Sequence, residues 1–530
     1  MPLQPLAPYK TPRRAAATQT AQLYNIPAPI GGLNLRDPIS AMLPTDAVTL
    51  DNMIPRQTGV EIRNGYKIHT DAIPYPIKSV FGYNAPNPAN NKLFAAANGK
   101  IYDVTTNPAT IVVALTNSNE DYWYTTQFST GADTFLLCVS PGAGYWTYST
   151  TSGWVNRTPA GLPTTTLKSL AVWKQRVFFT CEADTKIYYF HNVNVVDGPT
   201  SPFTMGALLR NGGYIAGLIN WTLDAGVGID DHLVVVGSQG DLAVWQGTDP
   251  QDAAEFALRG VWYCGPVPKY GRFFTSFGGD VLILSDLGLV PLSKLVNGQF
   301  VETTPGPSQK IQTILSPLVS ELISTATWDI FIVPASEVMV IKVPNQTSGG
   351  YRQFAMNVNT SAWCTFSGLP MHCTTILNGV LYFGTDDGTV CKGLFGSADA
   401  VLSDGTGGEL VEGDVQTAFN SFGTAGQLKR FGLVRPIFIA PEAPSVKAQV
   451  NTQYSFTGVA GSPSFNTSSE ALWDASTWNS SVWVGSSNTY QAWVGATGMG
   501  YYGSLRMKVR APANTIFTSS HFLVDVGGMM

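Results

Sequence analysis

A short hairpin pattern recurs along the chain and constrains its fold more than any other feature. Residues 231–247 read DHLVVVGSQGDLAVWQG, in which two apolar runs, Leu233–Val236 and Leu242–Trp245, flank a polar turn at Ser238–Gly240. Two β-rich runs around so short a turn predict a β-hairpin. A single hairpin cannot bury its apolar face, so this one needs neighbours.

Those neighbours are present in the sequence. Runs of the same form stand at 91–104, 133–148, 175–190, 279–292 and 378–393. Matching apolar segments, 77–82 and 167–172, precede two of them. Successive units lie roughly 40–60 residues apart, which is the spacing of propeller blades. We therefore predict an all-β chain with a β-propeller of about six to eight blades over residues 77–400.

A β-sandwich, or a row of small β domains, would also show many short strands. The segment before the hairpin favours the propeller, because a repeated unit is a stronger signal than strand content alone. Only 13% of residues are charged, about half the usual fraction, so large permanent interfaces are expected. The net charge of −5 argues against a free DNA-binding domain.

Four further segments complete the predicted organisation. We expect an extended N-terminal arm, an N-terminal platform segment, a polar Gly-rich linker and a C-terminal β-sandwich-like platform domain, at 1–28, 29–76, 401–414 and 415–530. The N-terminal platform segment is expected to pack with the C-terminal one.

Two short helices are also predicted. The first covers Pro44–Met53 with Thr45 as its N-cap, and the second covers Ser316–Ala326. In the second helix Ser316 would be the N-cap and Pro317 the first helical residue.

The motifs of common enzymes and cofactor sites are missing. The sequence has no G-x-S-x-G, H-E-x-x-H, P-loop or C-x-x-C motif, and its five histidines leave little for acid–base or metal chemistry. The cysteines stand mostly in apolar runs and are expected to be buried, reduced thiols: Cys138, Cys181, Cys264, Cys364, Cys373 and Cys391. We expect no catalytic activity, cofactor or metal.

The remaining carboxylates are better explained as turn residues. A propeller glycosidase would need carboxylates around the axis. The candidates stand at or near hairpin turns, where Asp caps its own backbone: Asp133, Asp184, Asp241, Asp286, Asp386 and Asp387. The pairs Asp230–Asp231 and Asp386–Asp387 are alternative calcium ligands. No run of about 18 apolar residues occurs, so no membrane-spanning helix is expected, and the N-terminus lacks the apolar core of a secretory signal.

A basic strand face lies near the C-terminus. Alternation in 505–513 places Arg506, Lys508 and Arg510 on one face of a predicted strand. These side chains could contact phosphates in a channel. An exposed strand face with solvated charges is the favoured alternative.

Several aromatic residues are candidates for stacking on sugars, on the expectation that they are exposed. They are Tyr145, Trp146, Trp473, Trp478 and Trp483.

An ordered set of motifs carries a family resemblance. The pieces are GGLN-x-RDP, LDN-M-x-P and R-x-GY near the N-terminus, and KRFGLVRPIF later in the chain. The residues concerned are Gly31, Gly32, Leu33, Asn34, Asp37, Pro38, Leu50, Asp51, Asn52, Pro55, Arg63, Gly65, Tyr66, Lys429, Arg430, Arg435 and Pro436. Followed by propeller-like repeats, the set resembles the nozzle or hub (tail tubular) proteins of short-tailed bacteriophages.

The resemblance implies a non-enzymatic virion component that is assembled in the host cytoplasm. Such a protein would form a homo-hexameric ring in the tail, joined to portal-adaptor ring proteins and to a tail needle, plug or fibre protein. Viral DNA would pass through transiently, without sequence-specific binding. The alternatives are a receptor- or glycan-binding propeller of the tail tip, and a polysaccharide-degrading enzyme.

Overall fold

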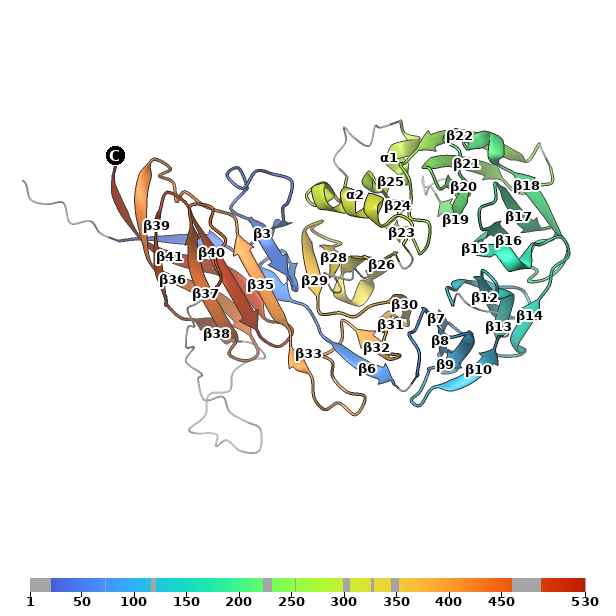
Figure 1. Cartoon of the computed structure of the whole chain (residues 1–530), viewed down its shortest axis with the longest axis horizontal. Coiled ribbons are helices and arrows are strands. Elements are labelled where there is room, and N and C mark those ends of the chain that lie inside the picture. The colour runs from blue at the N-terminus through green and yellow to red at the C-terminus, as the bar shows by residue number, and fades with distance from the viewer. Residues whose placement is uncertain are drawn as a thin grey trace, which may run out of the picture.

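The structure is a computed structural model that describes residues 21–71, 73–115, 121–222, 231–252, 254–298, 306–325, 328–344, 352–459 and 488–529. Strands account for 53% of it and helices for 6%, so the predicted all-β class is confirmed. Within the described residues, five four-stranded sheets, one three-stranded sheet and four strands of a nine-stranded sheet lie in a ring around a common axis (Figure 1). The predicted β-propeller is therefore confirmed.

The sheets follow one another in chain order around the ring. The first sheet contains β7 (Ser79–Tyr83), β8 (Lys92–Ala97), β9 (Lys100–Asp103) and β10 (Thr110–Ala114), and the second contains β11 (Tyr124–Ser129), β12 (Thr134–Ser140), β13 (Gly144–Ser149) and β14 (Gly153–Arg157). The third contains β15 (Leu167–Trp173), β16 (Arg176–Cys181), β17 (Lys186–Phe190) and β18 (Thr200–Thr204). The fourth contains β19 (Ile215–Thr222), β20 (Asp231–Gly237), β21 (Asp241–Gly247) and β22 (Phe256–Tyr263). The fifth sheet contains β23 (Phe274–Phe277), β24 (Asp280–Ser285) and β25 (Gly288–Pro291). The strands of the sixth are β26 (Asp329–Val333), β27 (Val338–Lys342), β28 (Arg352–Asn357) and β29 (Trp363–Ser367). The seventh and last contains β30 (Cys373–Leu377), β31 (Val380–Gly384), β32 (Val390–Gly393) and β6 (Tyr66–Thr70).

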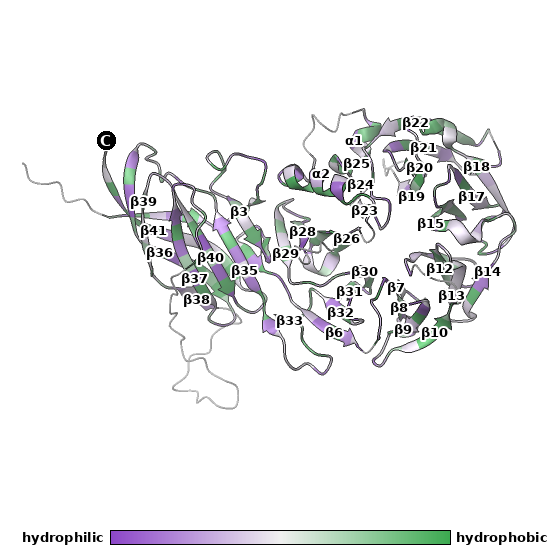
Figure 2. Cartoon of the chain, viewed as in Figure 1, coloured by the Kyte–Doolittle hydropathy of each residue, from purple (hydrophilic) through white to green (hydrophobic). Residues whose placement is uncertain are grey.

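Apolar packing between neighbouring sheets holds the ring together. The hairpin first seen in the sequence is β20–β21, and both strands are almost entirely buried because each face meets another sheet. Between the third and fourth sheets, Trp173, Phe178 and Trp245 share one buried cluster, and Trp245 stacks on Phe256 with ring centroids 4.6 Å apart. Burying one such side chain is worth about 1.5–3 kcal/mol. Figure 2 shows hydrophobic residues throughout the strands of the ring.

A strand from the N-terminal segment closes the ring. Strand β6 pairs antiparallel with β32, with Tyr66 opposite Gly393 and Thr70 opposite Val390. The last sheet therefore contains strands from both sides of the propeller in sequence. The range predicted for the propeller, 77–400, omits this strand, because a closing strand has no hairpin partner beside it in the sequence.

The remaining strands form two sheets beside the ring, here called the terminal sheets. Their strands are β1 (Gln22–Pro27), β2 (Gly32–Leu33), β3 (Asp46–Asp51), β4 (Met53–Pro55), β5 (Val60–Ile62), β35 (Glu412–Thr417), β36 (Gln427–Ala440), β37 (Ser445–Thr452), β38 (Asn488–Gln491), β39 (Val494–Gly500), β40 (Gly503–Arg510) and β41 (Ile516–Met529). One sheet has the order β38-β36-β41-β5-β4, with β1 on β41 and β39 on β36. The other runs β3-β35-β40-β37, with β2 on β3.

The second terminal sheet continues directly from a propeller sheet. Strand β29 runs parallel to β3, with Thr365 opposite Asp51, so β26–β29 and β3-β35-β40-β37 belong to one sheet (Figure 1). N-terminal and C-terminal strands pair within both terminal sheets: Leu50 lies opposite Val415, and Val60 opposite Phe517. This is the association expected for the two end segments.

The short helices differ from expectation. Residues 44–53 are not helical but contain β3 and the start of β4, because pairing with β35 outweighs a weak local helix signal. Helix α2 (Gln312–Glu321) begins before Ser316 and contains Pro317, so the predicted N-cap is also wrong. Its position is set by tertiary burial of Ile311, Leu315 and Val319 at helical spacing.

The smaller elements complete the chain. They are α1 (Leu292–Val296), the 3-10 helices Pro88–Asn90, Thr164–Thr166, Gly206–Leu208 and Pro334–Ser336, and the two-stranded ladder β33 (Ala398–Asp399) and β34 (Glu409–Leu410). The predicted linker, 401–414, thus includes β34 and the start of β35. Of the predicted arm, residues 1–20 lie outside the described residues. All six cysteines are free, and five of them are buried.

Ring closure gives a first prediction. Gly388 has φ +79°, and an added Cβ would lie 1.8 Å from the carbonyl oxygen of Ile73, just beyond β6. Gly153 has a similar φ of +65°, but an added Cβ would meet nothing within 4 Å. Gly388→Ala should therefore lower the free energy of unfolding by about 1–3 kcal/mol more than Gly153→Ala. Urea denaturation of the two variants checks this, and equal losses would contradict the closure described here.

Candidate functional site

The N-terminal motif residues meet where the propeller joins the terminal sheets. Arg63 is fully buried at this junction. Its two terminal nitrogens donate to Asp399 Oδ1 and Oδ2 at 2.8 and 2.7 Å, and its Nε donates to Asn52 Oδ1 at 2.7 Å. A further bond reaches the carbonyl oxygen of Ser367 at 2.8 Å. This planar, bidentate pairing is specific to arginine.

Asn52 links three segments of the junction. Its Nδ2 donates to Ser367 Oγ at 3.1 Å and to the carbonyl oxygen of Glu412 at 3.0 Å. Its Oδ1 accepts from the backbone N–H of Ser367 at 3.0 Å. The residue has φ 55°, a left-handed conformation that asparagine tolerates better than most side chains. One side chain therefore connects the β3–β4 corner to β29 and β35.

Neighbouring motif residues fit the same junction. Asp51 accepts hydrogen bonds from Thr365 Oγ1, at 2.6 Å, and from Ser367 Oγ. A Cβ on Gly65 would lie 1.9 Å from the carbonyl oxygen of Ala398, so only glycine fits without a shift. The Tyr66 ring packs edge-on against a core phenylalanine, and burial raises the pKa of its hydroxyl to about 12.

Asn34 belongs to a second cluster of hydrogen-bonded residues, which is centred on the N-terminal segment before β3. Its Nδ2 donates to Asp46 Oδ2 and to Asp37 Oδ2, each at 2.8 Å. Lys310 Nζ donates to Asp46 Oδ1 and to the carbonyl oxygen of Gly31, each at 2.7 Å. Gly32 has φ +77°, and an added Cβ would lie 2.6 Å from the backbone oxygen of a β29 residue. These residues hold the N-terminal segment against the sixth sheet.

The C-terminal motif residues also have structural contacts. Lys429 is buried, and its Nζ donates to the carbonyl oxygens of Gln427 at 2.9 Å and Tyr501 at 3.1 Å. Burial lowers the pKa of this ammonium group.

The other motif residues on β36 lie within its ladders. The Arg435 guanidinium lies 4.6 Å above the Trp493 ring and 2.6 Å from His521 Nδ1. Arg430 is exposed opposite Met499, and Pro436 pairs with Ser520 of β41.

The basic face predicted on β40 is paired with acids on β35. Arg506 donates to Asp414 Oδ2 at 2.7 Å. Lys508 and Arg510 donate to the two carboxylate oxygens of Glu412 at 2.6 and 2.8 Å. Hydrogen bonds from Lys508, and then from Arg510, lower the pKa of Glu412. The three cations are thus positioned by cross-strand partners, as on an ordinary strand face.

A groove of about 450 Å³ brings many of these residues together. Its lining includes Asp51, Asn52, Tyr66, Asp399, Glu412, Lys508 and Arg510. Figure 2 shows hydrophilic residues along β6 and β35, the strands that border this groove. Sequence reasoning missed Asp399, Thr365 and Ser367, because none of them stands in a motif and their partners lie more than 300 residues away.

Two other groups of candidate residues have structural explanations. Tyr145 is buried and its hydroxyl donates to the carbonyl oxygen of Val196 at 3.0 Å, so its predicted exposure is wrong; a core position fits the large apolar ring. Trp146 is half-buried and donates to the carbonyl oxygen of Ala143 at 2.9 Å. Trp473, Trp478 and Trp483 lie outside the described residues.

The aspartates predicted to cap their own turns differ in their contacts. Asp184 accepts from the backbone N–H of Lys186, two residues further on, at 3.1 Å, as a turn aspartate does. Asp241 is buried and accepts instead from the backbone N–H and the Nδ2 of Asn211, in an earlier segment, both at 2.8 Å. Asp230 lies outside the described residues. Within the part of the chain that the structure describes, no three His, Cys, Asp or Glu side chains are grouped to hold a metal ion, and no helix is long and apolar enough to cross a membrane.

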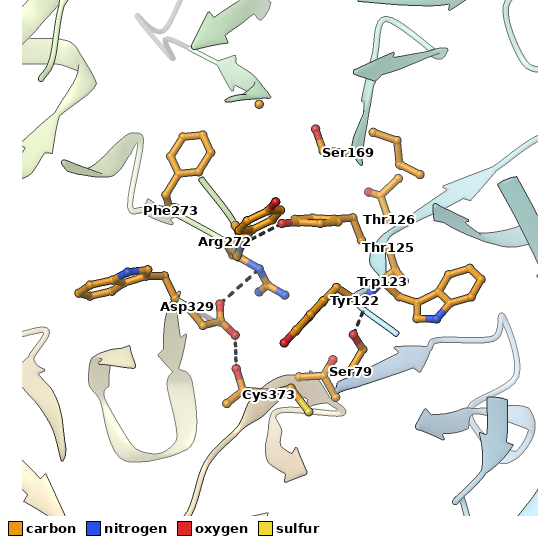
Figure 3. A pocket seen from close by; sticks show the side chains of 18 of the residues that line it. Ser79, Tyr122, Trp123, Thr125, Thr126, Ser169, Arg272, Phe273, Asp329 and Cys373 are labelled. Atoms are coloured by element: carbon orange, nitrogen blue, oxygen red, sulfur yellow. Dashed lines mark hydrogen bonds and ion pairs between the residues drawn. The ribbon is translucent and has the colours of Figure 1, made fainter. Parts of the chain in front are cut away.

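A cavity of about 530 Å³ lies on the propeller axis. It is lined by the beginnings of the innermost strands, among them Ser79, Ser169, Phe273, Asp329 and Cys373 (Figure 3). All seven sheets of the ring contribute to its wall, each through its innermost strand: β7, β11, β15, β19, β23, β26 and β30. No sequence motif predicts this site, since its residues come from separate repeats.

One wall of the cavity carries most of its charge. Arg272 Nε lies 3.6 Å from Asp329 Oδ1, and Thr374 Oγ1 donates to Asp329 Oδ2. On the neighbouring strands, Lys342 Nζ donates to the carbonyl oxygen of His372 at 2.7 Å, and burial lowers its pKa to about 8.

His372 also lines this wall. Its Nδ1 lies 2.8 Å from Asp386 Oδ1. Burial, and then the nearby Lys342 charge, lower its pKa to about 4, so the imidazole is neutral at pH 7.

No protein-family model and no curated protein matches this sequence. Solved structures align with part of the chain at low identity. The computationally designed Ika8 protein is 10% identical, with a TM-score of 0.34 over 62% of this chain and 99% of its own. The extracellular domain of the putative hybrid two component system BT3049 from B. thetaiotaomicron is 10% identical, with a TM-score of 0.39 over 66% and 45%. A catalytically inactive virginiamycin B lyase from Staphylococcus aureus with quinupristin is 9% identical, with a TM-score of 0.37 over 61% and 97%. Likeness at this level carries no argument about function.

The buried arginine gives a second prediction. Arg63→Met leaves Asp399 and Asn52 without their donors, so it should cost about 3–5 kcal/mol of unfolding free energy. Arg510→Met is the matched control: this side chain is 62% exposed, and its loss should cost no more than about 1 kcal/mol. Urea denaturation distinguishes them, and a comparable effect of both substitutions would refute the assigned role of Arg63.

The cavity histidine gives a third prediction. Its pKa is lower in the folded chain, about 4, than the ordinary 6.5, so the unfolded chain takes up the proton first. Its contribution to stability is therefore complete above pH 6.5 and is lost as the pH falls towards 4. His372→Asn should flatten the fall of unfolding free energy in this range, while His191→Asn, outside the cavity, should not. An unchanged slope in His372→Asn would contradict this assignment.

Proposed function

We propose that this protein is a structural subunit of a bacteriophage tail, a nozzle or hub ring that forms part of the DNA-ejection conduit. The observation that carries the proposal is the role of the motif residues. Asp51, Asn52, Arg63 and Gly65, which carry the family resemblance, all lie at the junction between the propeller and the terminal sheets. The resemblance therefore concerns the part of the molecule that fixes its architecture.

A rigid junction suits a subunit that bears load. A flexible Pro/Gly linker would let the propeller swing as an independent domain. Here one sheet continues from β26–β29 through β3 and β35, and a buried ion pair locks the crossing. Force applied to the propeller during DNA ejection would pass directly into the terminal sheets.

The terminal sheets are the proposed ring-forming platform. Leu23 of β1, Trp493 beside β39 and Met499 of β39 are exposed apolar residues on the β38-β36-β41 sheet. Exposed large apolar side chains on one sheet favour a protein contact. Six copies packed through these sheets would form the ring, with portal-adaptor proteins on one side and a needle, plug or fibre protein on the other.

The charge arrangement supports a conduit rather than a DNA-binding surface. The cations of β40 are already engaged by Asp414 and Glu412, so they would retain passing DNA weakly. Among the described residues that line the axial cavity, Asp329 is the sole carboxylate, whereas glycosidases generally use two. Both features favour a non-enzymatic role in the virion tail.

Electron microscopy of the purified protein and of virions tests the proposal. We expect closed six-fold rings with a central channel, located at the tail. Met499→Asp should reduce ring formation, since it places a charge on the proposed contact, and Val193→Asp, an exposed residue of a propeller loop, should not. A protein that stays monomeric at high concentration and is missing from virion tails would refute the proposed function.

A further inference from the structure

We propose that the axial cavity binds a small hydroxylated carboxylate of sugar size, such as a sugar acid, with Arg272 holding the carboxylate. This site is separate from the junction, and all of its lining residues come from one chain, so it does not require the proposed six-copy assembly. The cavity volume of about 530 Å³ falls within the range of small-molecule sites, about 300–1,000 Å³.

Arg272 supplies the anion-binding group. Its side chain is 51% exposed, and its only ion pair among the described residues is the 3.6 Å approach of Nε to Asp329. Figure 3 shows this side chain reaching into the cavity between Tyr122 and Asp329. The pair engages Nε, so the outer edge of the guanidinium remains available for a carboxylate, which it matches in geometry.

Two buried acceptors in the same wall lack donors. Asp329 Oδ1 has no hydrogen-bond partner among the described residues, although its side chain is only 10% exposed. His372 Nε2 is buried without a partner as well. Its Nδ1 faces Asp386, which fixes the proton on Nδ1 and leaves Nε2 as an acceptor. Buried acceptors are normally satisfied, so both call for hydroxyl donors.

The remaining wall suits the body of such a ligand. Thr125, Thr126 and Thr375 add hydroxyl groups, and Tyr122 and Phe273 add aromatic surface. Lys342 and Lys78 line the cavity too, so the cations of the wall outnumber its single carboxylate among the described residues. A ligand with one negative charge and several hydroxyls would complement this wall. A neutral sugar would offer no carboxylate to the guanidinium of Arg272. An anion without hydroxyl groups would offer no donors to Asp329 Oδ1 and His372 Nε2.

Isothermal titration calorimetry with three probes tests the inference. The probes are D-glucuronate, D-glucose, which lacks the carboxylate, and acetate, which lacks the hydroxyls. We expect the wild-type protein to bind glucuronate most tightly at neutral pH. Arg272→Met should weaken glucuronate binding roughly ten- to a hundredfold, which is the usual effect of losing a charged hydrogen bond. Binding of glucose should change little in that variant.

Arg352→Met is the matched control, since Arg352 is exposed on β28 and does not line the cavity. It should bind glucuronate like the wild type. Thermal melting of both variants shows that each remains folded, which half-exposed and exposed positions permit. The inference is overturned if no probe binds, if acetate binds as tightly as glucuronate, or if Arg272→Met binds glucuronate unchanged.

Discussion

A buried guanidinium–carboxylate pair, Arg63 with Asp399, determines how the two halves of this molecule meet. Placing an arginine where water cannot reach it costs several kcal/mol unless its donors are satisfied. Here the donors of Arg63 reach Asp399, Asn52 and the carbonyl oxygen of Ser367. Those partners come from the β3–β4 corner, the sixth sheet and the end of the propeller segment. The pair thus adds little net stability; its main effect is to fix where the terminal sheets join the propeller.

Strand pairing between distant segments extends the same constraint. Strand β6 completes the last sheet of the ring, and β3 carries the sixth sheet into the terminal sheets. Each pairing covers a strand edge that would otherwise remain open to other chains. A ring closed in this way cannot open without breaking backbone hydrogen bonds, so the propeller and the terminal sheets behave as one body.

The junction and the axial cavity differ in how far their polar groups are satisfied. At the junction, Asn52 and Arg63 use their donors and acceptors within the protein, which is the pattern of a structural network. In the cavity, Asp329 Oδ1 and His372 Nε2 have no hydrogen-bond partner among the described residues, and half of the Arg272 side chain is exposed. This contrast separates a part built for rigidity from a part built for a ligand.

The sequence by itself determined the features that depend on neighbours along the chain. Alternating apolar runs around Gly-containing turns specify hairpins, and hairpins with a preceding strand specify the all-β propeller, because both signals are local. The turn role of Asp184 and the burial of the cysteines follow from the same local patterns.

Only the tertiary structure decided what depends on distant partners. Residues 44–53 became a strand because β35 lies beside them, and Arg506 faces Asp414 because β40 pairs with β35. Tyr145 became a core residue because the neighbouring sheet covers it. The cavity residues come from separate repeats and meet only when the ring closes. Local patterns record strand and turn, whereas contacts across hundreds of residues are set by the packing of the whole chain.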